Sequence, residues 1–256
     1  MDIVFGLAFN LLLPLAIVYV MHRWIGWYPD QWKTSVNPKR EIAEIGVFWL
    51  LAMIASTAFL LTRSQEELSV PTTAVALEHM AYAVVPWLIL PLGYMALVRK
   101  WRWHDFGFTL PKSWPMIVFG LALFGLAGML PVFNSSFEPM SWAFVAIAAY
   151  QPAFIEEFFF RVIIQGKFER VVGPTKAWIY TGILFGLAHV PVDFFGPQFY
   201  ANGESYLNAF VVLLTQIIGG WIFGLIYAKT RSIFPGMLAH FMMDGRLGSI
   251  FIHLFG

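Results

Sequence analysis

Ionisable side chains interrupt three hydrophobic stretches in the second half of the chain. Residues 154–161 read Phe-Ile-Glu-Glu-Phe-Phe-Phe-Arg, residues 185–189 read Phe-Gly-Leu-Ala-His, and residues 240–246 read His-Phe-Met-Met-Asp-Gly-Arg. An ionisable residue at the centre of a bilayer costs about 2.5–3.5 kcal/mol on insertion scales, so such a residue faces a protein interior or a wet cavity. If these stretches cross a membrane, they indicate a polar site inside it.

Helical spacing divides these groups into pairs and single residues. Glu157 and Arg161 are four residues apart, so they share a helix face and can form an ion pair. Glu156 is rotated by about 100° from its neighbour, which leaves its carboxylate free for chemistry. His240 and Asp244 are also four apart, and we expect them on one face of a last helix.

The unpaired groups suit the activation of water. Burial raises the pKa of a carboxyl group toward the working range of a general base, and Glu156 could fill that role. His189 and His240 could share the water or donate a hydrogen bond to an oxyanion. The same three side chains could instead bind Zn²⁺, with water in the open fourth position. The sequence leaves both mechanisms open.

The composition excludes several classes of protein. Of the 256 residues, 59% are hydrophobic and 12% are charged, whereas about 25% of residues are charged in an average soluble domain. These values exclude a soluble globular enzyme, a disordered protein and a nucleic-acid binder, and they indicate a polytopic membrane protein. Because cysteine is absent, a disulfide framework, a thiolate metal site and a cysteine nucleophile are excluded as well.

The hydropathy pattern predicts an all-α protein with eight membrane-spanning helices, each of about 20 apolar residues. We treat residues 1–256 as one membrane domain, with three N-terminal helices in 1–98 and the core that carries the polar groups in 105–248. The predicted spans are 3–21, 42–61, 77–98, 116–132, 142–165, 175–190, 206–228 and 233–253.

The distribution of basic residues predicts the orientation. Most Lys and Arg residues lie in the loops after the first, third, fifth and seventh predicted spans. By the positive-inside rule these loops are cytoplasmic and both termini are extracytoplasmic. At 1.5 Å per residue, the polar groups lie within about 10–20 Å of the inner face. We therefore expect an integral protein of a prokaryotic cytoplasmic membrane, with its site nearer the cytoplasmic face.

Two glycine pairs predict close helix packing. Gly182 and Gly186 lie in the sixth predicted span, and Gly220 and Gly224 lie in the seventh. Small residues at this spacing allow two helix backbones to approach each other in a membrane. Asp193 follows a proline that is expected to end the sixth helix, so we expect it in an outer loop.

Three motifs occur in a fixed order on the late hydrophobic helices. They are Glu-Glu-x-x-x-Arg at 156–161, Phe-x-x-x-His at 185–189 and His-x-x-x-Asp at 240–244. Together they resemble the CAAX-protease and bacteriocin-processing family, also called the Abi family, which includes the Ras-converting CAAX endopeptidase. The Asp-Phe-Gly-Phe segment at 105–108 also resembles a segment common in this family. The resemblance covers about residues 105–248.

This resemblance implies an eight-helix intramembrane endopeptidase. It implies that Glu156 and His189 activate water and that His240, with Asp244, stabilises the oxyanion. The family is often described as a metallopeptidase, and a glutamate-dependent mechanism without metal has also been argued for it. The last motif often ends in Asn, which can donate a hydrogen bond. An ionised Asp244 cannot donate, so it would have to be protonated, bind metal or orient His240.

The resemblance assigns a structural or orienting role to Glu157 and Arg161. The expected substrate is a membrane-tethered or lipid-modified protein or peptide that enters from the lipid bilayer, and no nucleic-acid partner is expected. The sequence leaves two alternatives of other classes open. One is a transporter whose buried carboxylates carry protons. Related folds can lose catalysis and keep their helices, so the chain could be a non-catalytic membrane immunity or scaffold protein.

Overall fold

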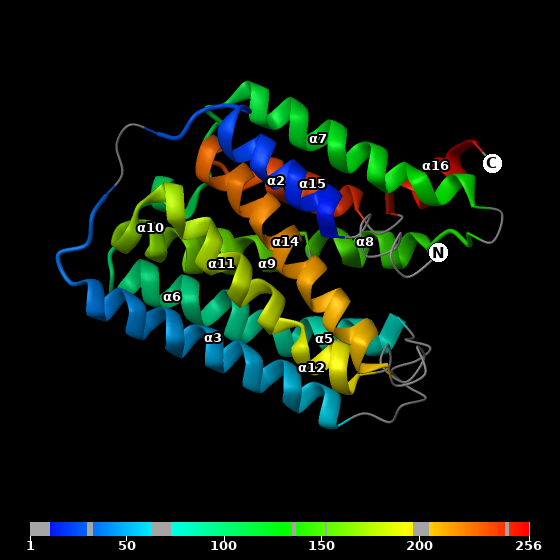
Figure 1. Ribbon diagram of the computed structural model, residues 1–256. Helices are drawn as coiled ribbons and strands as arrows, with labels where there is room; N and C mark the ends of the chain where they lie inside the picture. Colours follow the sequence, from blue (N-terminus) through cyan, green and yellow to red (C-terminus); the bar gives the residue numbers. More distant parts are fainter. Residues whose placement is uncertain are drawn as a thin grey trace.

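The computed structural model describes residues 11–29, 33–62, 73–134, 137–151, 153–196, 205–243 and 246–255. Within these ranges every regular element is a helix and no strand occurs. The helices lie side by side in an elongated bundle (Figure 1). The prediction of an all-α fold is therefore confirmed.

The first half of the chain forms the outer helices of the bundle. The segment from α5 to α6 is one long helix in which η2 is a wide, π-type turn, and α7 continues into the 3-10 turn η4. The elements are α2 (Leu13–Arg23), α3 (Pro38–Leu61), α5 (Thr73–Ala83), η2 (Val84–Ile89), α6 (Leu90–Leu97), η3 (Trp103–Phe106), α7 (Trp114–Met129) and η4 (Leu130–Phe133).

The second half supplies the central helices and all three motifs. The helical segment η5 is again π-type and continues directly from α9 into α10. The elements are α8 (Trp142–Tyr150), α9 (Ile155–Glu157), η5 (Phe158–Gln165), α10 (Gly166–Val172), α11 (Pro174–Ala188), α12 (Val190–Phe195), α14 (Tyr206–Thr230), α15 (Phe234–Met242) and α16 (Arg246–Phe255).

Local sequence signals set several helix ends. The side chain of Asn37 accepts a hydrogen bond from the backbone N–H of Arg40 (3.1 Å), and Pro38 follows at the first helical position of α3. Ser205 caps α14 in the same way. Such side chains satisfy backbone donors that have no partner inside the helix. Gly173, with φ +80°, turns the chain between α10 and α11.

Two central helical segments, η5 and α14, hold the bundle together. Every residue of η5 is buried, and it packs against α3, η2 and α11. The second central helix, α14, packs along α11 and also contacts α2 and α7 (Figure 1). Lys229 near the end of α14 is buried, and its Nζ donates to the backbone oxygens of Met21, His22 and Ile25 (2.6–2.9 Å). This lysine therefore supplies the hydrogen bonds that the C-terminal end of α2 lacks.

Six helices of the described residues are long and apolar enough to cross a membrane: Pro38–Leu61, Met80–Leu97, Trp114–Phe133, Trp142–Val172, Pro174–Phe195 and Tyr206–Thr230. Large apolar side chains such as Ile54 and Leu126 are exposed on the outer faces, at 65% and 72%. A lipid-facing surface explains this exposure. The protein is an integral membrane protein, but the predicted number of eight spans is not confirmed. The first predicted span begins outside the described residues.

The last predicted span, 233–253, is interrupted. The helix α15 ends at Met242, and Met243 has an extended backbone with ψ 172°, so α15 and α16 are separate short helices. The prediction of one continuous helix over 233–253 is therefore wrong, and the predicted common face of His240 and Asp244 is not tested. Asp244 itself lies outside the described residues, after the end of α15.

The fifth predicted span lies in the apolar segment Trp142–Val172, and the helix of this segment is broken once. The helix α8 ends at Tyr150, and Gln151 has an extended backbone (φ −127°, ψ 124°). The helix resumes at Ile155, so Glu156 lies in the first turn of a new helical segment. The sequence predicted a continuous helix over 142–165, in which Glu156 would lie deep in the middle.

The two glycine pairs bring α11 and α14 into close contact. A Cβ at Gly182 would lie 2.2 Å from Trp221 Cδ1 and 2.9 Å from its backbone nitrogen, and a Cβ at Gly220 would lie 2.8 Å from the Cα of Gly182. A Cβ at Gly186 would lie 3.0 Å from the backbone nitrogen of Ile217. No larger residue fits at these positions, which confirms the predicted close packing.

The segments with many basic residues meet at one end of the bundle, where α10 lies (Figure 1). The backbone N–H of Ser35 donates to Arg170 O, and that of Lys112 donates to Thr230 O, each at 2.9 Å. These contacts join the segment before α3, the segment before α7, α10 and the end of α14. The four segments that were predicted to lie on one side of the membrane are therefore neighbours.

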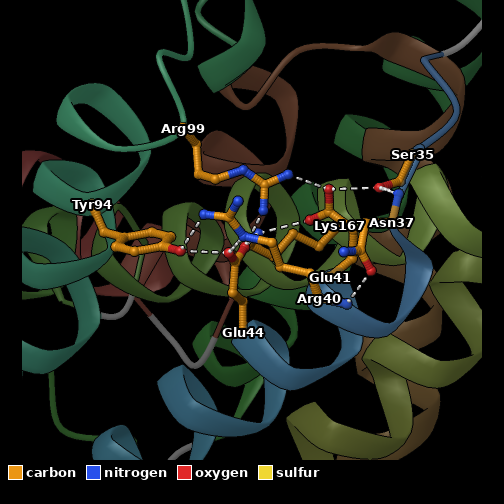
Figure 2. Close-up of polar contacts among 8 residues, drawn as sticks. All are labelled: Ser35, Asn37, Arg40, Glu41, Glu44, Tyr94, Arg99 and Lys167. Atoms are coloured by element: carbon orange, nitrogen blue, oxygen red, sulfur yellow. Dashed lines mark hydrogen bonds and ion pairs between the residues drawn. The ribbon is translucent and has the colours of Figure 1, made fainter.

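A cluster of ion pairs ties α3 to α6 and α10 at this end (Figure 2). Arg99 Nη2 and Nη1 donate to Glu41 Oε1 and Glu44 Oε2, both at 2.5 Å. Lys167, which is completely buried, donates to Glu41 Oε2 at 2.8 Å and also to Glu44. Arg40 Nε adds a bond to Glu44 at 2.8 Å. The carboxylates of α3 thus have cationic partners from three segments.

Candidate active site

A buried network joins Glu157 to Arg161 and His240. Arg161 donates from Nε to Glu157 Oε2 (3.1 Å) and from Nη2 to Oε1 (3.3 Å), and His240 Nδ1 lies 3.1 Å from the same Oε1. Arg161 and Glu157 are both 0% exposed, and His240 is 4% exposed. The ion pair predicted from four-residue spacing is confirmed. The contact with His240 joins residues 83 positions apart, and the sequence did not predict it.

Aromatic rings enclose this network. The Arg161 guanidinium lies 5.0 Å from the ring centroid of Phe185 and 5.6 Å from that of Phe223, at distances typical of cation–π contacts. The imidazole of His240 stacks on Phe223, with the centroids 4.7 Å apart and the planes at 24°. The rings shield the charged groups from lipid and fix their orientation.

Two glycines make room for the same network. A Cβ at Gly236 would lie 2.8 Å from Glu157 Oε2, so a larger residue on this face of α15 would displace the carboxylate from its present position. Gly220 contributes its backbone oxygen, which accepts a hydrogen bond from Arg161 Nη1 at 3.2 Å. Both glycines were outside the predicted site, although Gly220 was predicted to lie at a close helix contact.

Glu156 differs from its neighbour Glu157. It is only half-buried, and within the described part of the chain it makes no hydrogen bond or ion pair. The rotation between adjacent helical positions accounts for the difference, because it points the two side chains in different directions. The expectation that Glu156 remains unpaired agrees with this arrangement.

His189 lies at the C-terminal end of α11, one helical turn after Phe185. Its Nδ1 bonds the backbone oxygen of Phe185 at 2.8 Å, and the two rings are 4.9 Å apart. A carbonyl oxygen only accepts, so Nδ1 must carry the proton. In neutral His189 the lone pair is then on Nε2, and this nitrogen has no hydrogen-bond partner among the described residues. His189 is therefore oriented to accept a proton or a hydrogen bond at Nε2.

His240 is held differently. Its Nδ1 bonds a carboxylate, which also only accepts when ionised, so Nδ1 is again the donor. The positive charge of a doubly protonated ring would here lie next to Glu157. The two histidines thus have unlike Nδ1 partners, a backbone oxygen for His189 and a carboxylate for His240.

The described residues contain no group of three or more His, Cys, Asp or Glu side chains placed to hold a metal ion. Glu156, His189 and His240, which the sequence suggested as Zn²⁺ ligands, are not brought together as a ligand set in this part of the structure. His240 Nδ1 bonds Glu157, and a carboxylate on the second ring nitrogen is also common for histidines that bind a metal.

Asp193 is buried at 4% exposure, so its predicted place in an outer loop is wrong. Its backbone N–H donates to His189 O at 2.9 Å. Pro191 lies in the first turn of α12, where its missing N–H costs nothing, so the proline starts a short helix after the break. The Oδ2 atom of Asp193 is buried and has no hydrogen-bond partner among the described residues.

The family comparison covers all three motifs. Residues 137–245 match the family model described as Rce1-like, type II CAAX prenyl endopeptidase Rce1-like. No curated protein and no solved structure matches the chain. The matched stretch lies inside the predicted core 105–248 and includes α9, η5, α11 and α15. The match confirms the resemblance that the motifs predicted: residues 137–245 carry the sequence pattern of the Rce1-like type II CAAX prenyl endopeptidase family.

Proposed function

We propose that this protein is an intramembrane endopeptidase that hydrolyses a peptide bond of a membrane-tethered or lipid-modified protein. The observation that carries the proposal is the contrast between adjacent carboxylates. Glu157 is fully paired inside the protein, whereas Glu156 is half-buried and unpaired among the described residues. A glutamate without a structural partner is available to act as a general base.

In the proposed reaction, Glu156 takes a proton from water as the water oxygen attacks the scissile carbonyl carbon. His189 accepts the second hydrogen bond of that water at Nε2, since its Nδ1 is held by the Phe185 oxygen. When the tetrahedral intermediate collapses, the C–N bond breaks and the proton on Glu156 passes to the leaving amine. No step of this scheme requires a metal ion.

His240 is proposed to stabilise the oxyanion by donating from Nε2. Because Nδ1 already donates to Glu157, donation from Nε2 requires a doubly protonated ring. Glu157 and Arg161 would then act as positioning residues, which hold that ring in place. Asp244 is proposed to assist His240 from the segment after α15. By the positive-inside rule we place the site nearer the cytoplasmic face.

The test compares new protein termini in membranes from cells that produce the wild type or the Glu156→Gln variant at equal abundance. Mass spectrometry should find termini that appear with the wild type and disappear in the variant. Glu138→Gln is the matched control, because Glu138 is an exposed glutamate outside the motifs. It should leave the termini unchanged, and all three proteins should unfold at similar temperatures.

Full cleavage by Glu156→Gln would contradict the mechanism. If the wild type and the variant gave identical termini and no cleavage, the non-catalytic immunity or scaffold function would be favoured instead. A purified-protein assay then tests the substrate class. A farnesylated peptide ending in a CAAX sequence should be cleaved faster than the same peptide without the lipid.

A further inference from the structure

A cavity of about 280 Å³ opens at the end of the bundle where the basic segments meet. It lies between the segment before α3, the η3 region, α10 and the end of α14, away from the three motifs. Its lining includes four basic and two acidic side chains: Lys33, Lys112, Arg170, Arg231, Asp105 and Glu169.

The charges that line this cavity do not balance. Lys33 Nζ pairs with Asp105 Oδ1 at 2.5 Å, and Arg231 pairs with Glu169. Both acidic side chains are thereby used. Neither Lys112 nor Arg170 has an ion-pair partner in the part of the chain that the structure describes, so the cavity carries two surplus positive charges.

Trp101 forms part of the wall of the cavity. The guanidinium of Arg170 lies 4.8 Å from its ring centroid, which holds the arginine side chain against the cavity wall. The indole Nε1 of Trp101 is buried and has no hydrogen-bond partner in the described structure. In the described structure the Arg170 guanidinium makes no hydrogen bond, and an anion inside the cavity would bring acceptor oxygens to it.

The neighbouring side chains place this cavity at the level of lipid headgroups. Trp103, Leu110 and Trp114 belong to the same segment as the cavity wall and are 70%, 87% and 68% exposed. Tryptophan is enriched at the interface between membrane and water, where its ring is half solvated. A basic pocket between membrane helices on the cytoplasmic side is the type of site that binds phospholipid headgroups.

We propose that this cavity binds the phosphate of an anionic phospholipid headgroup, with Lys112 and Arg170 as its main ligands. The surplus of two positive charges favours a lipid with a net negative headgroup over a zwitterionic one, whose own cation would be repelled. The planar guanidinium of Arg170 can bind two phosphate oxygens at once. The site is separate from the proposed peptidase chemistry, and its test does not depend on cleavage.

The experiment measures ligand binding to the lipid-depleted protein in a neutral detergent, by thermal unfolding and native mass spectrometry. The ligands are dihexanoyl phosphatidylglycerol, dihexanoyl phosphatidylcholine and inorganic phosphate. Phosphatidylglycerol should raise the unfolding temperature in a saturable way, and phosphatidylcholine should not. A basic residue near a membrane surface contributes about 1 kcal/mol to the binding of anionic lipid. The single variants Lys112→Gln and Arg170→Gln should therefore each weaken phosphatidylglycerol binding about fivefold, and the double variant should weaken it roughly 30-fold.

Lys176→Gln is the matched control, because Lys176 is an exposed lysine on α11 that does not line the cavity. It should bind phosphatidylglycerol like the wild type. An equal loss in this control would mean that general surface charge, and not the cavity, attracts the lipid. Stabilisation by inorganic phosphate as strong as by the lipid would mean that the ligand is a soluble phosphate. Absence of saturable phosphatidylglycerol binding would overturn the proposal. If Arg170→Gln fails to fold, Lys112→Gln decides, since the Lys112 side chain is exposed.

Discussion

Replacing Arg161 with Met is expected to destabilise the protein by about 3–5 kcal/mol, because it leaves the buried carboxylate of Glu157 without its cation. The substitution keeps most of the side-chain volume and removes two hydrogen bonds to Glu157 and one to the backbone oxygen of Gly220. Only His240 would still donate to the carboxylate.

The double variant Glu157→Gln/Arg161→Met is expected to recover most of this loss. With the buried charge gone, the remaining costs are the lost second hydrogen bond to the Gly220 oxygen and a weaker bond from His240 to the Gln amide oxygen. One lost hydrogen bond with a neutral partner costs about 1 kcal/mol. The double variant should therefore lose about 1–2 kcal/mol, less than Arg161→Met alone.

The assay is equilibrium unfolding in detergent micelles at neutral pH, for the wild type, the two single variants and the double variant. The coupling free energy of this cycle reports the interaction between the two side chains. Lys176→Met, which removes an exposed charge, is the control and should change stability by less than about 0.5 kcal/mol. Additive losses in the double variant would refute the reasoning, because they would show that the charge of Glu157 does not depend on Arg161.

Three further perturbations test other parts of the fold. Lys229→Met should cost about 1–3 kcal/mol in unfolding measurements, because it removes the donor shared by three backbone oxygens at the end of α2. Gly182→Ala should cost about 1–3 kcal/mol by forcing α11 and α14 apart, whereas Gly219→Ala, with nothing within 4 Å of the added Cβ, should cost less than Gly182→Ala in the same assay. Burial alone would raise the pKa of the Asp105 carboxyl. The hydrogen bonds that it accepts from Lys33 and from the backbone N–H of Arg102 outweigh burial, so the pKa lies below its usual 3.8. The ionised Asp105 should therefore stabilise the fold above pH 3.8, and this stabilisation should be lost as the pH falls through the lowered pKa of the folded state. In acid unfolding, the Asp105→Asn variant should not show this loss of stability.

The parts of the site that depend on one helix could be predicted from the sequence. Glu157 and Arg161 are one turn apart, and helix geometry alone brings them together. The same geometry separates Glu156 from its neighbour. The contact between Glu157 and His240 depends on how α15 packs against α9, so no spacing rule could predict it.

The helix breaks were missed for a different reason. Average hydropathy stays high around Gln151 and Met243, because apolar stretches lie on both sides of each break, although Asp244 directly follows Met243. A hydropathy window measures how apolar a segment is and does not detect a change of backbone direction. At Pro191 the sequence predicted the end of a helix and a loop after it. A proline can also lie in the first turn of a helix, and Pro191 does so in the short helix α12. Asp193 therefore lies in this helix and is buried, and it does not lie in a loop.

The ion-pair cluster at the start of α3 also constrains how this protein is made. Glu41 lies 126 residues before Lys167 in the chain, so the ribosome exports the two acidic side chains of α3 long before α10 exists. Carboxylates that enter the edge of the bilayer without cations are costly. Glu44 can pair at once with Arg40 of the same helix, whereas the partners Arg99 and then Lys167 become available only as later segments are synthesised. The order of translation is therefore the order in which these ion pairs can form.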